Sequence, residues 1–350
     1  MSDLPSSSPS SPQPSSCRLS LEQKAGQLLM IGTDVDSPRG LADEIKRYQL
    51  GGIFLAGRST RPAAALKADI QALQGNATTP LLVALDQEGG SVQTLKGGDF
   101  PLIPSAERLG NGPPDKLRDE VRDSARRLAG IGVTINLAPV ADTVPADIGE
   151  ANPPIGNFHR QYGSDPAEVA KDIEVAVTAS QDSGVLTVLK HFPGLGRTRF
   201  NTDTSAQAVD ATATANDPYL QPFAAGIKAG SASVMMSSAS YPKLDGKDIA
   251  AFSKPIITGL LRQKMGFDGL VVSDDLGAAK AAATISPGER AVRFVAAGGD
   301  LALSIRPEDA QPMAEALITR ARTDPAFATR VDDAAGHVLR AKIRARQISC

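Results

Sequence analysis

The sequence contains no tryptophan, and aromatic residues make up only 4% of its 350 residues. This scarcity excludes a ligand platform built from several stacked aromatic rings. Apolar residues account for 41% of the chain, yet no apolar run approaches the roughly 20 residues that a membrane-spanning helix needs. The formal net charge is −2, so the overall charge does not favour nucleic acid or an anionic membrane as a partner.

Histidine and cysteine are also rare. The three histidines and two cysteines show no spacing typical of metal ligands, so we expect no metal site. Cys17 and Cys350 lie near the two ends of the chain. If the domain brings its termini together, a Cys17–Cys350 disulfide would close it and imply an oxidising compartment. Two unrelated thiols are the alternative.

The first 16 residues are almost all serine, proline and glutamine. Such a segment cannot bury apolar surface, so we predict a disordered linker over 1–16 and one folded domain over 17–350. The segment lacks the apolar core of a signal peptide, but tails of this kind often tether exported domains. We therefore expect an extracytoplasmic or secreted protein, and a cytoplasmic location stays open.

Beyond the linker, short apolar runs alternate with helical patterns. Nearly continuous apolar runs bounded by turn residues are typical of buried parallel strands. Helix starts are marked at Ser20 to Gln23 and Ser286 to Glu289, which both fit a capping box, and at Asp165-Pro166 and Asp217-Pro218. The apolar runs are Leu28 to Gly32, Gly52 to Ala56, Leu81 to Asp86, Ile135 to Val140, Val185 to His191, Ser233 to Ser237, Gly269 to Asp274 and Leu301 to Ile305.

Eight such strand–helix units favour an α/β fold of one domain, a (β/α)₈ TIM barrel. An open doubly wound sheet is the alternative. No phosphate-binding glycine fingerprint supports that alternative, because Gly194-Leu195-Gly196 lacks a third glycine at the required spacing.

Polar side chains follow several of the predicted strands. In a barrel, the carboxyl ends of the strands meet at one face and carry the chemistry. We therefore predict one polar site at the mouth of the barrel, suited to a polyhydroxylated ligand. The residues at these ends are Asp86 with Glu88, Asn136 with Asp142, Lys190 with His191, Ser237 with Ser238, and Asp274 with Asp275.

Several motifs, in order along the chain, resemble the N-acetylglucosaminidase branch of glycoside hydrolase family 3. The resemblance runs from about residue 19 to the C-terminal helical pattern and favours a layout with a single domain. The matching segments are Asp86-Gln87-Glu88-Gly89-Gly90, Leu137 to Asp142, Asn152 to Gly156, Arg160 to Gly163, Lys190-His191-Phe192-Pro193-Gly194 and Val272 to Leu276.

The resemblance implies a retaining glycosidase with a carboxylate nucleophile, a covalent intermediate and no cofactor. Asp274 matches the family nucleophile. The residues that match those holding sugar hydroxyls are Asp86, Arg160, Lys190 and His191. The implied substrate carries a terminal β-linked N-acetylhexosamine or a related β-glycoside, with peptidoglycan fragments as the substrate class. We expect a monomer.

The loop after the fifth predicted strand departs from the family pattern. The family's acid/base there is a histidine, backed by an aspartate two residues earlier. In this chain Asp203 matches the aspartate, but Ser205 replaces the histidine and Leu195 replaces a second histidine between two glycines. A serine hydroxyl cannot serve as a general base near neutral pH. Ser91 and Thr94 also replace arginines that are usual in muropeptide-cleaving members, so we expect a different substrate preference.

Three interpretations of this loss are open. Asp203 is itself the acid/base, with its pKa raised by burial; His159 reaches the site from an inserted segment; or the protein binds a sugar and barely hydrolyses it. A Schiff-base aldolase chemistry on Lys190 is a further, weaker alternative.

Other residues are expected to have supporting roles. We expect Glu88 to accept backbone amides around Gly89 and Gly90, and Asp275 to cap the following helix. Arg197 and Arg199 are expected to be solvated loop charges.

Overall fold

The computed structural model describes residues 18–349. The predicted linker over 1–16 and the Cys17–Cys350 disulfide lie outside the described residues, and both stay predictions. Within the part that is described, none of the helices is long and apolar enough to cross a lipid bilayer.

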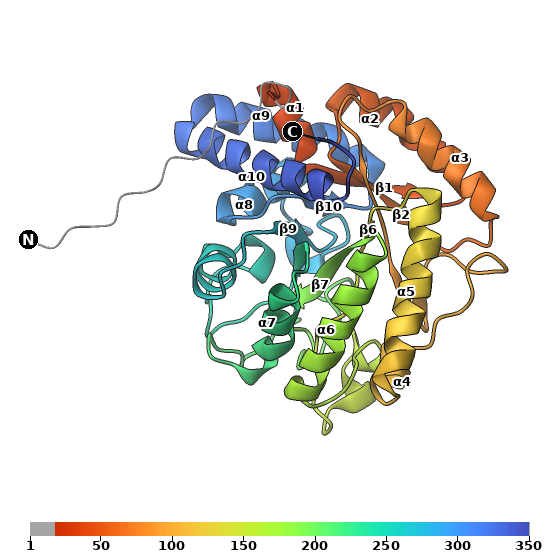
Figure 1. The fold of residues 1–350 in the computed structure, drawn as a ribbon. Helices are drawn as coiled ribbons and strands as arrows, with labels where there is room; N and C mark the ends of the chain where they lie inside the picture. The colour runs from red at the N-terminus through yellow and green to blue at the C-terminus, as the bar shows by residue number, and fades with distance from the viewer. Residues whose placement is uncertain (1–17, 350) are drawn as a thin grey trace, which may run out of the picture.

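Eight strands form one sheet in the order β10-β1-β2-β3-β6-β7-β8-β9, and every pairing is parallel. The two outer strands also meet, because Ser273 N donates to Leu301 O at 3.1 Å and Val272 forms a parallel bridge with Leu301. The sheet thus closes into a barrel with helices around it (Figure 1). This confirms the predicted (β/α)₈ fold over the open sheet. The strands are β1 (Leu29–Asp34), β2 (Gly52–Ala56), β3 (Leu82–Leu85), β6 (Ile135–Asn136), β7 (Leu186–Phe192), β8 (Ser233–Met236), β9 (Leu270–Ser273) and β10 (Ala302–Ser304).

The helices occupy the connections between these strands. They are α1 (Leu21–Gln27), α2 (Ala42–Tyr48), α3 (Ala63–Gln74), α4 (Ala106–Gly110), α5 (Pro114–Ile131), α6 (Pro166–Asp182), α7 (Gln221–Lys228), the π-helical η7 (Pro255–Lys264), α8 (Pro287–Ala297), α9 (Ala310–Thr323) and α10 (Pro325–Arg344). Short 3₁₀ turns are η2 (Pro38–Leu41), η3 (Gly149–Ala151), η4 (Gly156–Phe158), η5 (Pro218–Leu220), η6 (Ala250–Phe252), η8 (Lys280–Ala282) and η9 (Pro307–Asp309).

Each predicted apolar run overlaps one strand, but the ladder over 135–140 is shorter than expected. Only Ile135 and Asn136 pair continuously, and Val140 meets Lys190 through an isolated bridge. Pro139 lies in this segment and has no N–H to donate to a ladder. The loop after β3 adds an antiparallel pair that the sequence did not predict, β4 (Gln87–Gly89) with β5 (Val92–Gln93).

Three of the predicted helix starts have the expected caps. Ser20 forms a complete capping box, and the Asp165 and Asp217 carboxylates accept backbone N–H groups of α6 and η5. The box at Ser286 is only half formed: Ser286 accepts from Glu289 N at 3.4 Å. The Glu289 side chain instead pairs with Arg293 at 2.9 Å, one helical turn further on.

The strands are apolar on both faces because they separate two cores. Met30 packs in the barrel interior with residues such as Leu82 and Val272. Its neighbours Leu29 and Ile31 pack outward against the helices. Each fully buried Leu or Ile side chain contributes roughly 1.5–3 kcal/mol of hydrophobic free energy, before entropy is counted. This explains why the runs lack the alternation of half-exposed strands.

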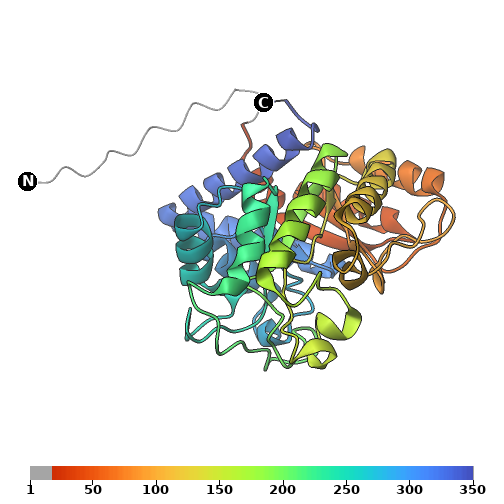
Figure 2. The same ribbon diagram turned by 60° about the horizontal axis from the view of Figure 1, so that its bottom comes forward.

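The two ends of the barrel differ. Val338 and Ala341 of α10 pack into the interior cluster, and the Gln347 side chain donates to Leu81 O just before β3. The C-terminal helix therefore covers the end where the strands begin. The loops that follow the strands lie on the side away from α10 (Figure 2), which leaves that end for the site.

Candidate active site

One cavity of about 280 Å³ opens at the carboxyl end of the barrel. The loops after β3, β6, β7, β9 and β10 all contribute to it, together with apolar side chains from the strands. The catalytic and sugar-binding residues predicted from the sequence all line this cavity: Asp86, Arg160, Lys190, His191, Asp203 and Asp274. The structure therefore brings together residues from five different connections around one space.

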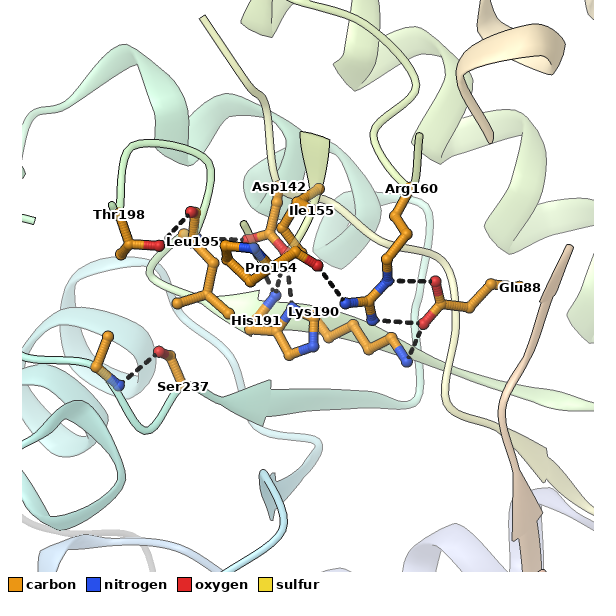
Figure 3. A network of polar contacts seen from close by, with 12 residues as sticks. Glu88, Asp142, Pro154, Ile155, Arg160, Lys190, His191, Leu195, Thr198 and Ser237 are labelled. Atoms are coloured by element: carbon orange, nitrogen blue, oxygen red, sulfur yellow. Dashed lines mark hydrogen bonds and ion pairs between the residues drawn. The ribbon is translucent and has the colours of Figure 1, made fainter. Parts of the chain in front are cut away.

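The cations Lys190 and Arg160 both bind the Glu88 carboxylate on one side of the cavity (Figure 3). Lys190 Nζ lies 2.7 Å from Asp86 Oδ1 and 2.5 Å from Glu88 Oε1. Arg160 binds Glu88 through Nε at 2.8 Å and Nη2 at 2.7 Å, and donates to Pro154 O at 2.8 Å. The fork geometry of the guanidinium fixes the Arg160 side chain in the cavity wall.

This network corrects the expected role of Glu88. Glu88 joins Arg160 and Lys190, and its side chain is 5% exposed. Burial acts to raise the pKa of Glu88, but the charges of Arg160 and Lys190 outweigh burial and hold it at about 2. Burial acts to lower the pKa of Lys190, but the negative charges of Asp86 and Glu88 outweigh burial and raise it. Both cations thus stay charged, and Asp86, which is only partly buried, keeps an oxygen available for a ligand.

His191 is oriented by Asp142. Its Nδ1 lies 2.7 Å from Asp142 Oδ2, and the same carboxylate accepts the backbone N–H groups of His191 and Leu195. Asp142 has no exposed surface. A carboxylate at Nδ1 holds the proton on that nitrogen, so Nε2 is the nitrogen that His191 presents to the cavity.

Asp274 follows β9 directly. Its backbone N–H donates to Met236 O at 2.9 Å, which continues the pairing of β9 with β8 beyond the strand end. Its Oδ1 accepts from Asp275 N at 2.9 Å. Within residues 18–349, no cation pairs with the Asp274 carboxylate in the way that Glu88 and Asp86 are paired. The Asp274 carboxyl group therefore lines the cavity without a cationic partner among the described residues, which leaves its oxygens accessible for nucleophilic attack.

Asp275 also lines the cavity, and it caps a turn instead of a helix. Its Oδ1 accepts from Gly277 N at 2.8 Å and from Ile305 N at 3.0 Å, which joins the loops after β9 and β10. Burial, with the nearby charges of Asp274 and Asp203, raises the pKa of Asp275 to about 6 although the two amides lower it.

Asp203 lies at the cavity mouth on the loop after β7. Its surroundings raise its pKa: desolvation contributes most, followed by the negative charge of Asp274, while His191 and Arg160 act in the opposite direction. In the described part of the chain, no side chain holds the Asp203 carboxylate by a hydrogen bond. Its backbone N–H donates to Asn201 Oδ1 at 2.9 Å. Asp203 is an exposed residue, and a carboxyl group with a raised pKa near a second carboxylate is a pairing suited to general acid chemistry.

The structure does not bring His159 to the cavity. Its Nδ1 lies 2.7 Å from Glu107 Oε2, and 45% of its side chain is exposed. Ser205, at the position of the missing histidine, accepts from Gln207 N at 3.1 Å and does not line the cavity.

Arg197 is not the solvated charge that the sequence suggested. It binds Asp210 and Asp217, and its side chain is 19% exposed. Arg199, two residues on, is exposed as expected. No group of three or more histidine, cysteine, aspartate or glutamate side chains within residues 18–349 is arranged to hold a metal ion.

Three functional features were missed at the sequence level: the bridge at Glu88, the Asp142–His191 pair and the raised pKa of Asp275. The sequence analysis placed Asp142 and Asp275 at the strand ends that form the site, but it did not predict the partner of Asp142 or the pKa of Asp275. The partners of Glu88 come from segments 72 and 102 residues further along the chain, and no local pattern indicates them.

Comparison with known proteins agrees with this geometry. The family model described as the glycosyl hydrolase family 3 N terminal domain matches residues 20–341. A beta-hexosaminidase of Mycobacterium tuberculosis, LpqI, is 32% identical over 309 residues, which cover 85% of this chain and 76% of that protein.

Solved structures give the same result. A beta-N-acetylhexosaminidase from Beutenbergia cavernae superposes with a TM-score of 0.91 at 46% identity, covering 93% of this chain and 99% of that chain. A glycoside hydrolase family 3 beta-N-acetylglucosaminidase from Paenibacillus sp. superposes with a TM-score of 0.88 at 31% identity, covering 95% and 64%. The closed barrel, the convergent site and the match over residues 20–341 together show that this chain belongs to glycosyl hydrolase family 3.

Proposed function

We propose that this protein is a retaining β-N-acetylhexosaminidase that removes a terminal β-linked N-acetylhexosamine, with Asp274 as the nucleophile and Asp203 as the acid/base. The observation that carries the proposal is the single cavity that Asp274 and Asp203 line together with two cations and an imidazole. The 46% identity to a beta-N-acetylhexosaminidase over 93% of the chain supports the choice of sugar.

The binding step uses the groups around the cation network. Asp86 accepts sugar hydroxyls, and Lys190 and Arg160 donate to them. His191, with its proton held on Nδ1 by Asp142, accepts a hydroxyl at Nε2. Because Glu88 and Asp86 together compensate the two cations, the wall can donate several hydrogen bonds without an uncompensated buried charge.

The chemical step divides between the two aspartates. The Asp274 carboxylate attacks C1 of the sugar, and the C1–O bond to the leaving group breaks as Asp203 donates its proton to that oxygen. Asp203 is then a carboxylate and takes a proton from water, whose oxygen attacks C1 and releases Asp274. The raised pKa of Asp203 suits the first half of this cycle.

Fragments of peptidoglycan are the proposed natural substrates. They carry the terminal β-linked N-acetylglucosamine that the reaction requires, and a bacterial beta-hexosaminidase, LpqI, matches 85% of this chain. Neither Ser91 nor Thr94 lines the cavity, and Thr94 is buried.

A carbohydrate-binding barrel with impaired catalysis is the second candidate. It is favoured by one observation, the absence of an imidazole from the loop after β7, where Ser205 stands. Trapping separates the two. A 5-fluoro glycosyl fluoride with the 2-acetamido group should attach covalently to the peptide that contains Asp274. Reversible binding without a covalent adduct would favour the binding protein.

Asp203 is tested by leaving-group dependence. With an N-acetylglucosaminide whose leaving group is poor, Asp203→Asn should be slower than wild type by roughly 10²–10⁴-fold, because that leaving group must be protonated. With a highly activated aryl leaving group the loss in the first step should be small. Equal rates of the variant and wild type on both substrates would remove Asp203 from the mechanism.

A further inference from the structure

The Asp203 carboxylate depends on its backbone for position. In the described part of the chain no side chain binds it, and its residue lies in the middle of an irregular segment over 198–209, here called the Asp203 loop. A general acid must be held close to the leaving-group oxygen, so the anchors of this loop bear directly on the rate.

The two ends of the Asp203 loop meet at one arginine. Arg197 precedes the loop, and its Nε donates to Asp210 Oδ2 at 2.8 Å just after the loop ends. Its Nη2 donates to Asp217 Oδ2 at 2.6 Å, and Nη1 lies 3.3 Å from Asp217 Oδ1. The guanidinium also lies over the Tyr219 ring at 4.3 Å. The Arg197 side chain thereby connects the segment that enters the Asp203 loop to the segment that leaves it.

The two aspartates are rigid supports. Asp210 Oδ1 accepts from Thr212 N, Thr212 Oγ1 and Ala213 N at 2.9, 2.7 and 3.1 Å. Asp217 Oδ1 accepts from Tyr219 N at 3.0 Å and begins η5. Their side chains are only 3% and 6% exposed. Arg197 is therefore the cation that binds both of these nearly buried carboxylates.

The loop itself rests on the segment that carries the nucleophile. Lys280 N donates to Thr202 O at 3.1 Å, which connects the residue before Asp203 to the chain that follows β9. At the start of the loop, Asn152 Nδ2 donates to Leu195 O and Thr198 O at 2.8 and 2.9 Å. Arg197 adds an ionic contact between the start of the Asp203 loop and the segment that follows the loop.

We propose that Arg197 is a positioning residue that holds the Asp203 loop over the cavity by binding Asp210 and Asp217. The inference rests on the proposed function, in which Asp203 is the acid/base. Arg197 does not line the cavity. It therefore acts through the Asp203 loop and not by direct contact with the substrate. The exposed Arg199 makes no comparable contact in the described structure and provides a matched control.

The test compares Arg197→Lys with Arg199→Lys. Lysine keeps the charge but cannot bind two carboxylates in the fork geometry of a guanidinium. With a poor leaving group, Arg197→Lys should lower kcat by about 10–100-fold, with KM nearly unchanged, because a shift of about 1 Å in a catalytic group costs this much. An activated leaving group should largely restore the rate. Arg199→Lys should match wild type on both substrates.

Hydrogen exchange measures the anchor directly. Amides of the Asp203 loop should exchange faster in Arg197→Lys, while those of the barrel strands should not change. Asp217→Asn provides a second variant, because asparagine retains the capping oxygen of η5 but loses the charge that Arg197 binds. It should change exchange and kcat in the same direction. This second variant keeps the test valid if Arg197→Lys folds poorly.

The outcomes separate the inference from the function on which it rests. Unchanged exchange of the loop in both variants, or equal losses with both leaving groups, would overturn the role of Arg197. A wild-type rate of Asp203→Asn with the poor leaving group would instead overturn the acid/base assignment. The exchange measurement would still report whether Arg197 anchors the loop.

Discussion

His191 Nδ1 lies 2.7 Å from Asp142 Oδ2, and the Asp142 carboxylate is completely buried. This pair fixes both the orientation and the tautomer of the imidazole. In Asp142→Asn, an amide N–H₂ can replace the acceptor at Nδ1, so the His191 proton would move to Nε2 and the ring would become a donor toward the cavity. We expect kcat/KM to fall by roughly 10–100-fold.

The same substitution should also lower stability, by about 1–3 kcal/mol, since Asp142 accepts two backbone amides as well. Steady-state kinetics and thermal unfolding measure the two effects. Asp142→Asn combined with His191→Gln should be little slower than His191→Gln alone if both act through this contact. Additive losses would contradict that interpretation.

Asp274→Asn should abolish turnover, with a loss of roughly 10⁴-fold or more. The amide cannot form the covalent intermediate, while its oxygen can still accept from Asp275 N, so the fold should persist. Binding of N-acetylglucosamine, measured by calorimetry, should remain because Asp86, Lys190 and His191, which line the cavity and are proposed to contact the hydroxyls, are unchanged. Activity near the wild-type level would exclude Asp274 as the nucleophile.

The position of the site could be predicted from the sequence for a simple physical reason. Parallel strands place their carboxyl ends at one edge, so residues such as Asp86, Lys190 and Asp274 must converge wherever the fold is a barrel. The apolar runs revealed the strands because both faces of each strand are buried. The fold and the residues predicted to form the site therefore follow from local patterns along the chain.

Partners across long separations could not be predicted in the same way. Glu88 could have bonded nearby amides, and only the folded chain shows that Arg160 and Lys190 surround it. Arg197 illustrates the same limit within one loop. Several acidic residues lie downstream, and only the path of the chain decides that Asp210 and Asp217 reach it.

The pH dependence of activity should reflect Asp203. Desolvation and the charges of Asp274 and Asp86 raise its pKa, with His191 and Arg160 opposing them. The first step requires the protonated form, so kcat/KM should fall as pH rises through this raised pKa. A pH profile with a poor leaving group should show this alkaline limb, and Asp203→Asn should remove it. An unchanged limb in the variant would assign it to another group.

Asp275→Asn should stabilise the protein at neutral pH. The folded-state pKa of Asp275 is raised to about 6 from 3.8, so the folded state binds more protons than the unfolded state between these values. Stability therefore decreases as pH rises through that window. Asparagine keeps the oxygen that accepts from Gly277 and Ile305. We expect a gain of about 1–2 kcal/mol at pH 7.5, discounted for partial exposure, and a smaller gain at pH 4.

Chemical denaturation at the two pH values measures this effect. Asp268→Asn, at an exposed position outside the cavity, is a suitable control for the general loss of one negative charge. If Asp275→Asn gives the same gain at pH 4 and pH 7.5, the stabilisation does not arise from the titration of Asp275.

Lys342 offers a second test of buried charge, at the opposite end of the barrel. It has no exposed surface, its Nζ donates to Gln27 Oε1, and burial lowers its pKa to about 7. Since the folded-state pKa is below the unfolded value of 10.5, stability is lost as pH falls toward 7 and levels off below it. Lys342→Met removes this loss, so its stability relative to wild type should be roughly 2–3 kcal/mol more favourable at pH 6 than at pH 9.

The comparison between two pH values isolates the charge from packing. Lys342→Met also leaves Gln27 Oε1 without its donor, although Gln27 Nε2 keeps its bond to Gln49 O at 2.8 Å. That cost is the same at both pH values and cancels in the difference. Lys116→Met, at an exposed position of α5, should show no such pH dependence. If the effect of Lys342→Met on stability does not depend on pH, burial does not lower the pKa of Lys342 in the folded state.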